Sequence, residues 1–267
     1  MTAVEGGVRT ITEVRAPGDV PLWVHPEWAD LFPTIAQGTT GRGDGAEPFN
    51  LGLAGDQPVG AALDRWRSLL PLTGMTTVVH ARQVHGADLW IHRERGAPGI
   101  VVMDRFDGHV TDREGLLLAV GVADCVPVFV IDAEGGAVAL VHAGWRGVAG
   151  GIVERAIHRL VESWQSAPER LRLHCGPSIC GECYEVGPEV HAGVHPDREP
   201  PAGNTCIDLR AAIAGRALAE GLLAEHVTLS SHCTLCGPPD FFSHRGGARE
   251  RQMAVLGVSS GLGPEET

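Results

Sequence analysis

Three short segments of this sequence each place a metal-binding side chain beside a glycine or next to an apolar run. These side chains are His85, Cys125 and His142. Two imidazoles and one thiolate form a three-ligand set for zinc, which leaves a fourth coordination position open, as in catalytic rather than structural zinc sites. The ligands are separated by 40 and 17 residues, so the fold must gather them, and their spacing alone is a weak signal.

Asp124 and Cys125 interrupt an otherwise apolar run over 116–131. A carboxylate in a buried run is costly unless it is paired or lies near a metal ion. Cys125 alone fits an inert buried thiol, which is the commoner fate of this residue. Because Asp124 does not fit that reading, the pair favours a functional site, in which Asp124 is a candidate proton carrier.

The segment after His142 has the pattern of an anion site. A strand, a glycine turn and a helix start follow one another, so free backbone N–H groups and the helix dipole point at one place. Arg146 lies there and could hold a phosphate group in bidentate fashion. A glycine turn with Arg146 paired to a surface acid fits the pattern equally well.

Three further residues are candidates for substrate binding. Arg42 lies in a glycine-rich turn, Asn50 follows that turn, and Arg245 follows the motif Phe-Phe-Ser-His. The two arginines could add positive charge to a pocket, although solvated surface positions explain them as well.

The chain has seven cysteines, and four of them form two C-x-x-C pairs. An odd count favours reduced thiols or metal ligands over a disulfide framework. The pairs Cys180/Cys183 and Cys233/Cys236 could together hold a structural zinc ion, although they are further apart in sequence than in a usual zinc ribbon.

Composition indicates a compact globular protein with an acidic surface. The 267 residues are 43% hydrophobic and 20% charged, with a net charge of −12. This charge disfavours nucleic acids and anionic membranes as partners. No apolar stretch is long enough to span a bilayer, and the N-terminus lacks the pattern of a signal peptide, so we expect a cytoplasmic protein. The oligomeric state stays open.

The elements that must position these residues follow from hydrophobic periodicity. We expect one α/β domain over 1–267 with mixed sheets, an irregular segment over 1–35, a glycine-rich turn over 37–45 and a loose tail over 261–267. Apolar residues at helical spacing predict helices over 56–70, 152–164 and 208–223, the last beginning at Asp208 as N-cap. Apolar runs predict strands over 76–80, 88–92, 100–103, 116–122, 126–131, 137–142, 171–174, 226–232 and 252–258.

The motifs resemble those of a known family, the laccase-domain or polyphenol-oxidase family, whose members are regarded as purine nucleoside phosphorylases with adenosine deaminase activity. The similarity runs from about residue 36 to 258, in family-like order and spacing. The matching stretches are QVHG at 83–86, DGHVT at 107–111, LAVGVADCVP at 118–127, HAGWRGVAGG at 142–151, GPSI at 176–179, CYEVG at 183–187, CTLC at 233–236 and FFSHR at 241–245.

The resemblance implies a fold, a cofactor and a reaction. The fold would be a single layered α/β/β/α domain similar to the catalytic domain of cytotoxic necrotizing factor. The zinc ligands would be His85, Cys125 and His142. The substrates would be adenosine, inosine, guanosine or methylthioadenosine, which phosphate cleaves to base and ribose 1-phosphate, and adenosine could instead be deaminated to inosine.

The sequence departs from the family pattern at several arginines. Arg42 is displaced by one position, Gly246 follows Arg245 where a second arginine is usual, and His244 stands where tyrosine is common. The zinc set is untouched, but it stays open which arginines hold phosphate.

Three other functions remain as alternatives. A metal-free hydrolase would use Cys125 as nucleophile and His142 as base. A copper-dependent phenol oxidase fits poorly, because multicopper sites use His-x-His pairs and this chain has none. A non-enzymatic protein would carry only a structural zinc on the two C-x-x-C pairs.

Overall fold

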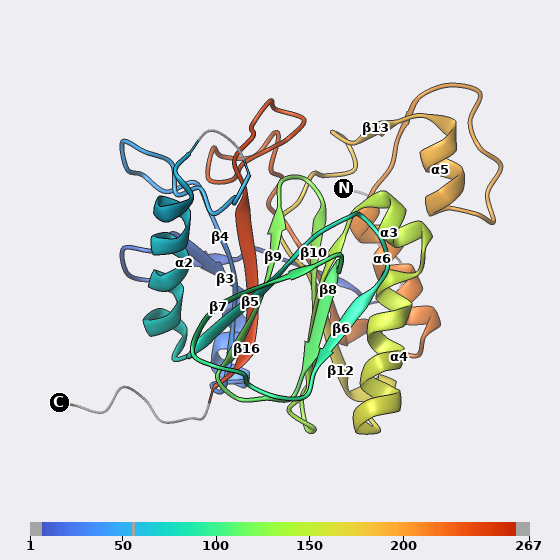
Figure 1. Ribbon diagram of the computed structural model, residues 1–267. Helices are drawn as coiled ribbons and strands as arrows, with labels where there is room; N and C mark the ends of the chain where they lie inside the picture. The colour runs from blue at the N-terminus through green and yellow to red at the C-terminus, as the bar shows by residue number, and fades with distance from the viewer. Residues whose placement is uncertain (1–6, 55–56, 260–267) are drawn as a thin grey trace.

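Two seven-stranded mixed sheets stacked face to face form the centre of the computed structural model, which describes residues 7–54 and 57–259 (Figure 1). Helix α2 (Val59–Thr73) covers the outer face of one sheet, and α4 (Ile152–Trp164) and α6 (Leu209–Ala219) cover the outer face of the other. The predicted α/β/β/α layering is therefore confirmed. The likeness to cytotoxic necrotizing factor stays a prediction.

The first sheet combines parallel pairs at its edges with an antiparallel centre. Its strand order is β1 (Arg9–Ile11), β15 (Val227–Ser230), β12 (Leu171–Cys175), β10 (Val126–Asp132), β11 (Val138–Ala143), β8 (Gly108–Thr111) and β6 (Leu89–His92). Strand β10 lies antiparallel to both β11 and β12, while β1, β15 and β12 run parallel, as do β6 and β8.

The second sheet has the order β2 (Val14–Arg15), β3 (Leu22–Val24), β4 (Ile35–Thr40), β16 (Gln252–Val258), β9 (Leu116–Val122), β5 (Thr77–Arg82) and β7 (Gly99–Asp104). At its centre β16 and β9 pair antiparallel, and on the far side of β9 the strands β9, β5 and β7 run parallel. A small separate ribbon joins β13 (Glu185–Val186) to β14 (Thr205–Cys206).

The helices lie outside the two stacked sheets. Within the described residues they are α1 (Pro26–Leu31), α2 (Val59–Thr73), α3 (Trp145–Ala149), α4 (Ile152–Trp164), α5 (Pro188–Val194) and α6 (Leu209–Ala219), with two short 3-10 turns, Pro168–Arg170 and Ala224–His226. No helix in the part of the chain that is described is both long and apolar enough to cross a bilayer.

Strand side chains alternate between an inner and an outer core. In β9, Leu116, Leu118 and Val120 face the other sheet, whereas Leu117 and Ala119 pack beneath α2. In β10 and β11 the same alternation sends one set of residues to the inter-sheet core and the other set to the layer of α4 and α6. Both faces of these strands are covered, which explains why their sequences are continuously apolar.

Two strands and one helix have the predicted bounds, and a second helix ends earlier than predicted. Strands β9 and β16 and helix α4 have the predicted bounds. Helix α6 has the predicted cap, since the Asp208 side chain accepts hydrogen bonds from Arg210 N and Ala211 N, but it ends at Ala219 because Gly221 follows with a φ of 96°.

The glycine-rich segment near residue 37 and the N-terminal segment hold more structure than the sequence predicts. Strand β4 begins at Ile35 and pairs with both β3 and β16, so the predicted turn over 37–45 is wrong for its first half. Residues 7–35 are not irregular either, because they form β1, β2, β3 and α1. The predicted loose tail over 261–267 lies outside the described residues, as do residues 1–6, and the single domain over 1–267 stays a prediction.

Candidate metal centre

Three strand ends bring His85, Cys125 and His142 together, as the sequence predicts. His85 lies in the loop after β5, Cys125 in the turn between β9 and β10, and His142 near the end of β11. One ligand atom from each lies within 4.8 Å of the others. The imidazole planes of His85 and His142 meet edge to face, with ring centroids 4.8 Å apart.

The side chain of Asp107 organises this cluster from behind. Its carboxylate is fully buried and accepts hydrogen bonds from His142 Nδ1 at 2.9 Å and from the backbone N–H groups of Val84, His85 and Gly86 at 3.1, 2.9 and 2.8 Å. Because Nδ1 of His142 donates to Asp107, Nε2 is left as the ligand atom. A carboxylate behind a ligating histidine fixes its tautomer and raises its basicity.

Backbone geometry at the cluster is held by polar side chains. His85 and Asp124 both have left-handed φ values, 58° and 83°, which are uncommon for residues other than glycine. The Asp107 carboxylate holds the first of these turns. The Gln83 amide holds the same loop to β9, accepting from Gly121 N at 2.7 Å and donating to Gly121 O at 2.8 Å.

The approach of α3 requires glycine at position 144. A Cβ there would lie 3.1 Å from Cys125 Sγ and 3.2 Å from a carbon of the His85 ring. A side chain at this position would therefore press directly on two of the three candidate ligands.

Charges within the cluster favour an ionised thiol. Burial raises the pKa of Cys125, but the charge and hydrogen bonds of His142 and His85 outweigh it and lower the pKa to about 6. Burial opposes protonation of His142, whereas the Cys125 thiolate and Asp107 raise its pKa to about 9. Without a metal ion, these charges pair the Cys125 thiolate with a protonated His142; a soft divalent metal ion would replace the Nε2 proton and bind both residues.

A cavity of about 650 Å³ opens on the cluster. Loop 52–54, the ends of β5 and β9, β7 and the segment 244–253 form its wall. Three arginines line it, namely Arg82, Arg249 and Arg251. This concentration of cations on an otherwise acidic protein makes the cavity suitable for an anionic ligand.

None of the four residues that the sequence suggests for substrate binding lines this cavity. Asn50 is buried, and its side-chain oxygen accepts from Gly52 N and Arg251 N, so it supports the wall from outside. Arg42 lies over the Phe242 ring, Arg146 over Trp145 and Arg245 over Tyr184. Nothing in the sequence marks the cavity arginines, which come together only because the strands that carry or follow them lie side by side in one sheet.

Asp124 is turned away from the cavity. Its carboxylate accepts from the Thr234 hydroxyl at 2.6 Å and from Arg245 N at 2.7 Å, and its side chain is buried. Both carboxylate oxygens are thus engaged. These contacts favour a role in shaping the turn that carries Cys125 over the expected role as proton carrier.

A second group of possible metal ligands consists of the four cysteines of the two C-x-x-C pairs. The sulfur atoms of Cys180, Cys183, Cys233 and Cys236 all lie within 4.8 Å of one another. The fold therefore overcomes their wide separation in sequence. None of the four lines the arginine-containing cavity.

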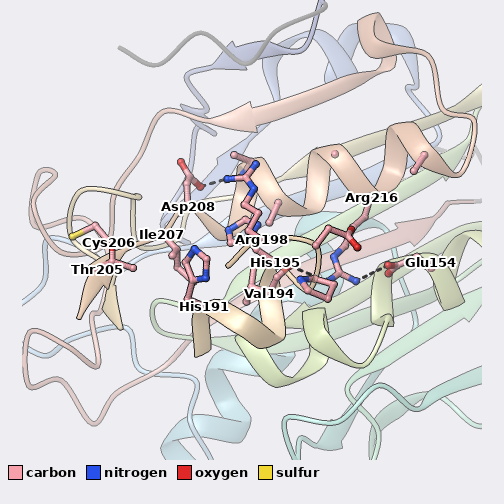
Figure 2. Close-up of a pocket in the computed structure, with 16 residues that line it drawn as sticks. Glu154, His191, Val194, His195, Arg198, Thr205, Cys206, Ile207, Asp208 and Arg216 are labelled. Atoms are coloured by element: carbon pink, nitrogen blue, oxygen red, sulfur yellow. Dashed lines mark hydrogen bonds and ion pairs between the residues drawn. The ribbon is translucent and has the colours of Figure 1, made fainter. Parts of the chain in front are cut away.

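Another cavity, of about 660 Å³, lies between α5 and α6 (Figure 2). Its lining includes His191, His195, Cys206 and Arg216, and Arg216 is paired with Glu154 at 2.7 Å. It contains none of the candidate ligands of either cysteine-containing group.

Fold and site together define a layered protein of two mixed sheets with a candidate mononuclear metal centre at the strand ends. The chain belongs to the multi-copper polyphenol oxidoreductase laccase family, whose model matches residues 36–259.

Curated relatives match over most of their length. A purine nucleoside phosphorylase from Deinococcus radiodurans is 37% identical over 92% of this chain and 95% of its own. One from Xylella fastidiosa is 34% identical over 90% and 98%. An adenosine deaminase, RL5, from an unknown prokaryotic organism is 35% identical over 60% of each chain.

Solved structures share the architecture. The crystal structure of YlmD from Geobacillus stearothermophilus superposes with a TM-score of 0.84 at 28% identity, covering 93% of this chain and all of that one. A Bacillus licheniformis protein, YfiH, superposes with a TM-score of 0.81 at 24% identity, covering 92% and 98%.

Proposed function

We propose that this protein is a zinc-dependent purine nucleoside phosphorylase that also deaminates adenosine. Its substrates would be adenosine, inosine, guanosine or methylthioadenosine, with phosphate as the second substrate. The observation that carries the proposal is the meeting of His85, Cys125 and His142 beside a cavity that also holds three arginines. The reaction is inferred from its relatives, which are purine nucleoside phosphorylases and an adenosine deaminase.

The donor set fits zinc. Two imidazoles and one thiolate match the three-ligand catalytic sites of this metal, and Asp107 provides the carboxylate that usually backs a ligating histidine. When bound, zinc would supply Lewis acidity to whatever occupies the open coordination position.

The cavity suits a nucleoside and an anion together. Its volume of about 650 Å³ lies within the usual range for small-molecule sites. Arg251 and Arg82, whose Nε also donates to Asp104 at 2.6 Å, would hold phosphate with charge-assisted hydrogen bonds and orient it toward the sugar. Leu53, Val102 and Met253 offer apolar contacts for the purine.

A metal-free cysteine hydrolase is the second candidate, because the same residues resemble a nucleophile–base–carboxylate triad. Cys125, His142 and Asp107 follow one another through hydrogen bonds and opposite charges. His85 favours the metal site, since a nucleophile and its base require only one imidazole.

The reaction can be tested by product identification. Purified protein is incubated with adenosine with and without phosphate, after its zinc and copper contents have been measured. We expect adenine and ribose 1-phosphate only with phosphate, inosine without it, and loss of both activities in His85→Ala but not in His158→Ala, an exposed histidine that belongs to neither ligand group and does not line the cavity.

Two results would contradict the proposal. One is a zinc-containing preparation that turns over no purine nucleoside. The other is a metal-free protein whose Cys125 is readily alkylated, which would support the hydrolase instead.

A cytoplasmic location completes the proposal. All seven cysteines are free in the structure, and reduced thiols are the rule in the reducing cytosol. Measuring the protein in fractionated cells tests this.

A further inference from the structure

We propose that Cys180, Cys183, Cys233 and Cys236 hold a second zinc ion, which is structural and fastens the two loops that support the turn carrying Cys125. The four sulfur atoms lie within 4.8 Å of one another. Four cysteines in two C-x-x-C pairs form the closed tetrahedral set of structural zinc sites and leave no position for substrate.

Backbone N–H groups around Cys233 indicate a thiolate. Its sulfur accepts from Cys180 N at 3.3 Å and from Leu235 N and Cys236 N at 3.4 Å each. A sulfur that is the acceptor for three backbone donors is stabilised in its anionic, metal-binding form. The donors come from both C-x-x-C pairs, so this sulfur is shared between the two loops.

Each C-x-x-C pair forms a tight turn of the kind that aims both thiols to one side. Cys183 N donates to Cys180 O, and Gly237 N donates to Cys233 O, both at 3.1 Å. A Cβ at position 237 would collide with the Cys233 carbonyl oxygen, so only glycine allows the second turn to close. Backbone hydrogen bonds therefore hold both turns, with no need for a bond between the sulfur atoms.

The two loops meet at Asp124. Ile179 N donates to the Asp124 carbonyl oxygen at 3.0 Å, and the Thr234 hydroxyl donates to the Asp124 carboxylate at 2.6 Å. Thr234 N also donates to Ser178 O, which joins the loops directly. A zinc ion that clamps these loops would therefore fix the strained backbone of Asp124, and with it the position of the neighbouring Cys125.

Counting zinc tests the proposal independently of any enzymatic activity. Full-length protein purified without chelator is analysed by elemental mass spectrometry. We expect about two zinc ions per chain in the wild type, about one in His85→Ala and about one in Cys236→Ser. Cys206→Ser is the matched control, since Cys206 is exposed and in neither ligand group, and it should keep about two.

Cobalt substitution identifies the ligands of the ion that remains. Cobalt(II) held by four thiolates has a spectrum distinct from cobalt(II) held by two imidazoles and one thiolate. His85→Ala should retain the four-thiolate spectrum, whereas Cys236→Ser should lose it.

The proposal is overturned if the wild type holds about one zinc ion and His85→Ala removes it. It is also overturned if the four cysteines are found as disulfides in protein denatured without reductant. Both results come from the wild type and His85→Ala, so they stand even if Cys236→Ser does not fold. Neither result contradicts the proposed phosphorylase activity, which depends on the group of His85, Cys125 and His142.

Discussion

Asp107 is the residue on which the candidate metal centre depends most, although it would not touch a metal ion. Its carboxylate orients His142 and at the same time holds the loop of His85 through three backbone N–H groups. One buried side chain thus fixes two of the three ligands. Removing its charge should lower the affinity for a metal ion rather than unfold the protein.

We predict that Asp107→Asn weakens zinc binding at the candidate metal centre by about 10- to 100-fold, the usual effect of losing a carboxylate behind a ligating histidine. The asparagine amide would also place its own N–H donors against backbone N–H groups that now donate to the Asp107 carboxylate, so a hydrogen bond would be lost. Zinc affinity is measured by competition with a chromogenic chelator. Asp88→Asn, an exposed carboxylate close by in the chain, is the control, and equal affinities for the two variants would refute the assigned role of Asp107.

A second prediction at this scale concerns phosphate. If Arg251 holds phosphate, Arg251→Met should lower kcat/KM for phosphorolysis by about 10- to 100-fold, which corresponds to one charge-assisted hydrogen bond. Deamination of adenosine uses no phosphate and should change little, so it is an internal control for folding. Comparable loss of both activities would indicate that Arg251 acts only through its hydrogen bonds to Arg249 O and Glu250 O.

At the scale of residues, the sequence predicts the three candidate ligands but not the side chains that support them. His85, Cys125 and His142 were identifiable because each is a metal-binding side chain next to a glycine or an apolar run. Arg251 had no such mark, since it reaches the cavity only because β16 pairs with β9. For Asp124, the sequence does not show that the hydroxyl of Thr234, far along the chain, donates a hydrogen bond to its carboxylate.

At the scale of elements, α1 illustrates how a helix start can depend on a neutral histidine. His25 is the N-cap, and its Nδ1 accepts from Trp28 N at 3.3 Å while Nε2 faces the Thr228 hydroxyl. Its ring stacks on Trp28 and is buried. Burial first, and then the nearby charge of His174, lower the pKa of His25 to about 3.

The sign of the pH effect follows from this shift. The pKa of His25 is about 3 in the folded chain and 6.5 as its reference value, so between these pH values the unfolded chain binds a proton that the folded chain does not. His25 therefore leaves the free energy of unfolding unchanged above pH 6.5, where the ring is neutral in both states. As the pH falls from 6.5 toward 3, protonation of the unfolded chain lowers the free energy of unfolding by up to about 1.4 kcal/mol per pH unit.

We predict that His25→Asn flattens this part of the stability profile. Asparagine keeps a side-chain oxygen at the N-cap but does not titrate. Urea unfolding at a series of pH values should show a slope reduced by up to about 1.4 kcal/mol per pH unit between pH values of about 4 and 6. Above pH 7 the two profiles should run parallel. An unchanged slope would mean that His25 titrates equally in the folded and unfolded chains.

The elements predicted well are those whose sequence pattern is set by their own burial. Strand β9 is apolar at every position because it lies between α2 and the other sheet, so its bounds were evident. Strand β4 contains Gly38 and two threonines and is a strand because β3 and β16 pair with it. Such long-range pairing leaves no local period in the sequence.

At the scale of the whole molecule, the inter-sheet core holds together the two sheets that carry the candidate ligands. Leu118 and Leu256 from one sheet meet Phe129 and Leu140 from the other. His85 follows β5 in one sheet and His142 ends β11 in the other, so the candidate metal centre spans the two sheets. The geometry of the site therefore depends on the sheets remaining stacked.

This dependence predicts that the sandwich unfolds as one unit. Leu140 is fully buried in the inter-sheet core, and Leu140→Ala should lower the free energy of unfolding by about 2–5 kcal/mol, the usual cost of a cavity in a well-packed core. Tryptophan fluorescence reports on both outer layers, since Trp66 lies in α2 and Trp164 in α4. Fluorescence and far-UV circular dichroism should then give one coincident transition, shifted to lower urea concentration.

The control is Leu223→Ala, at a position 43% exposed, which should change the free energy of unfolding by no more than about 0.5 kcal/mol. Two separate transitions, with only one moved by Leu140→Ala, would show that the sheets belong to independent folding units, and a metal centre shared between them could not then be rigid.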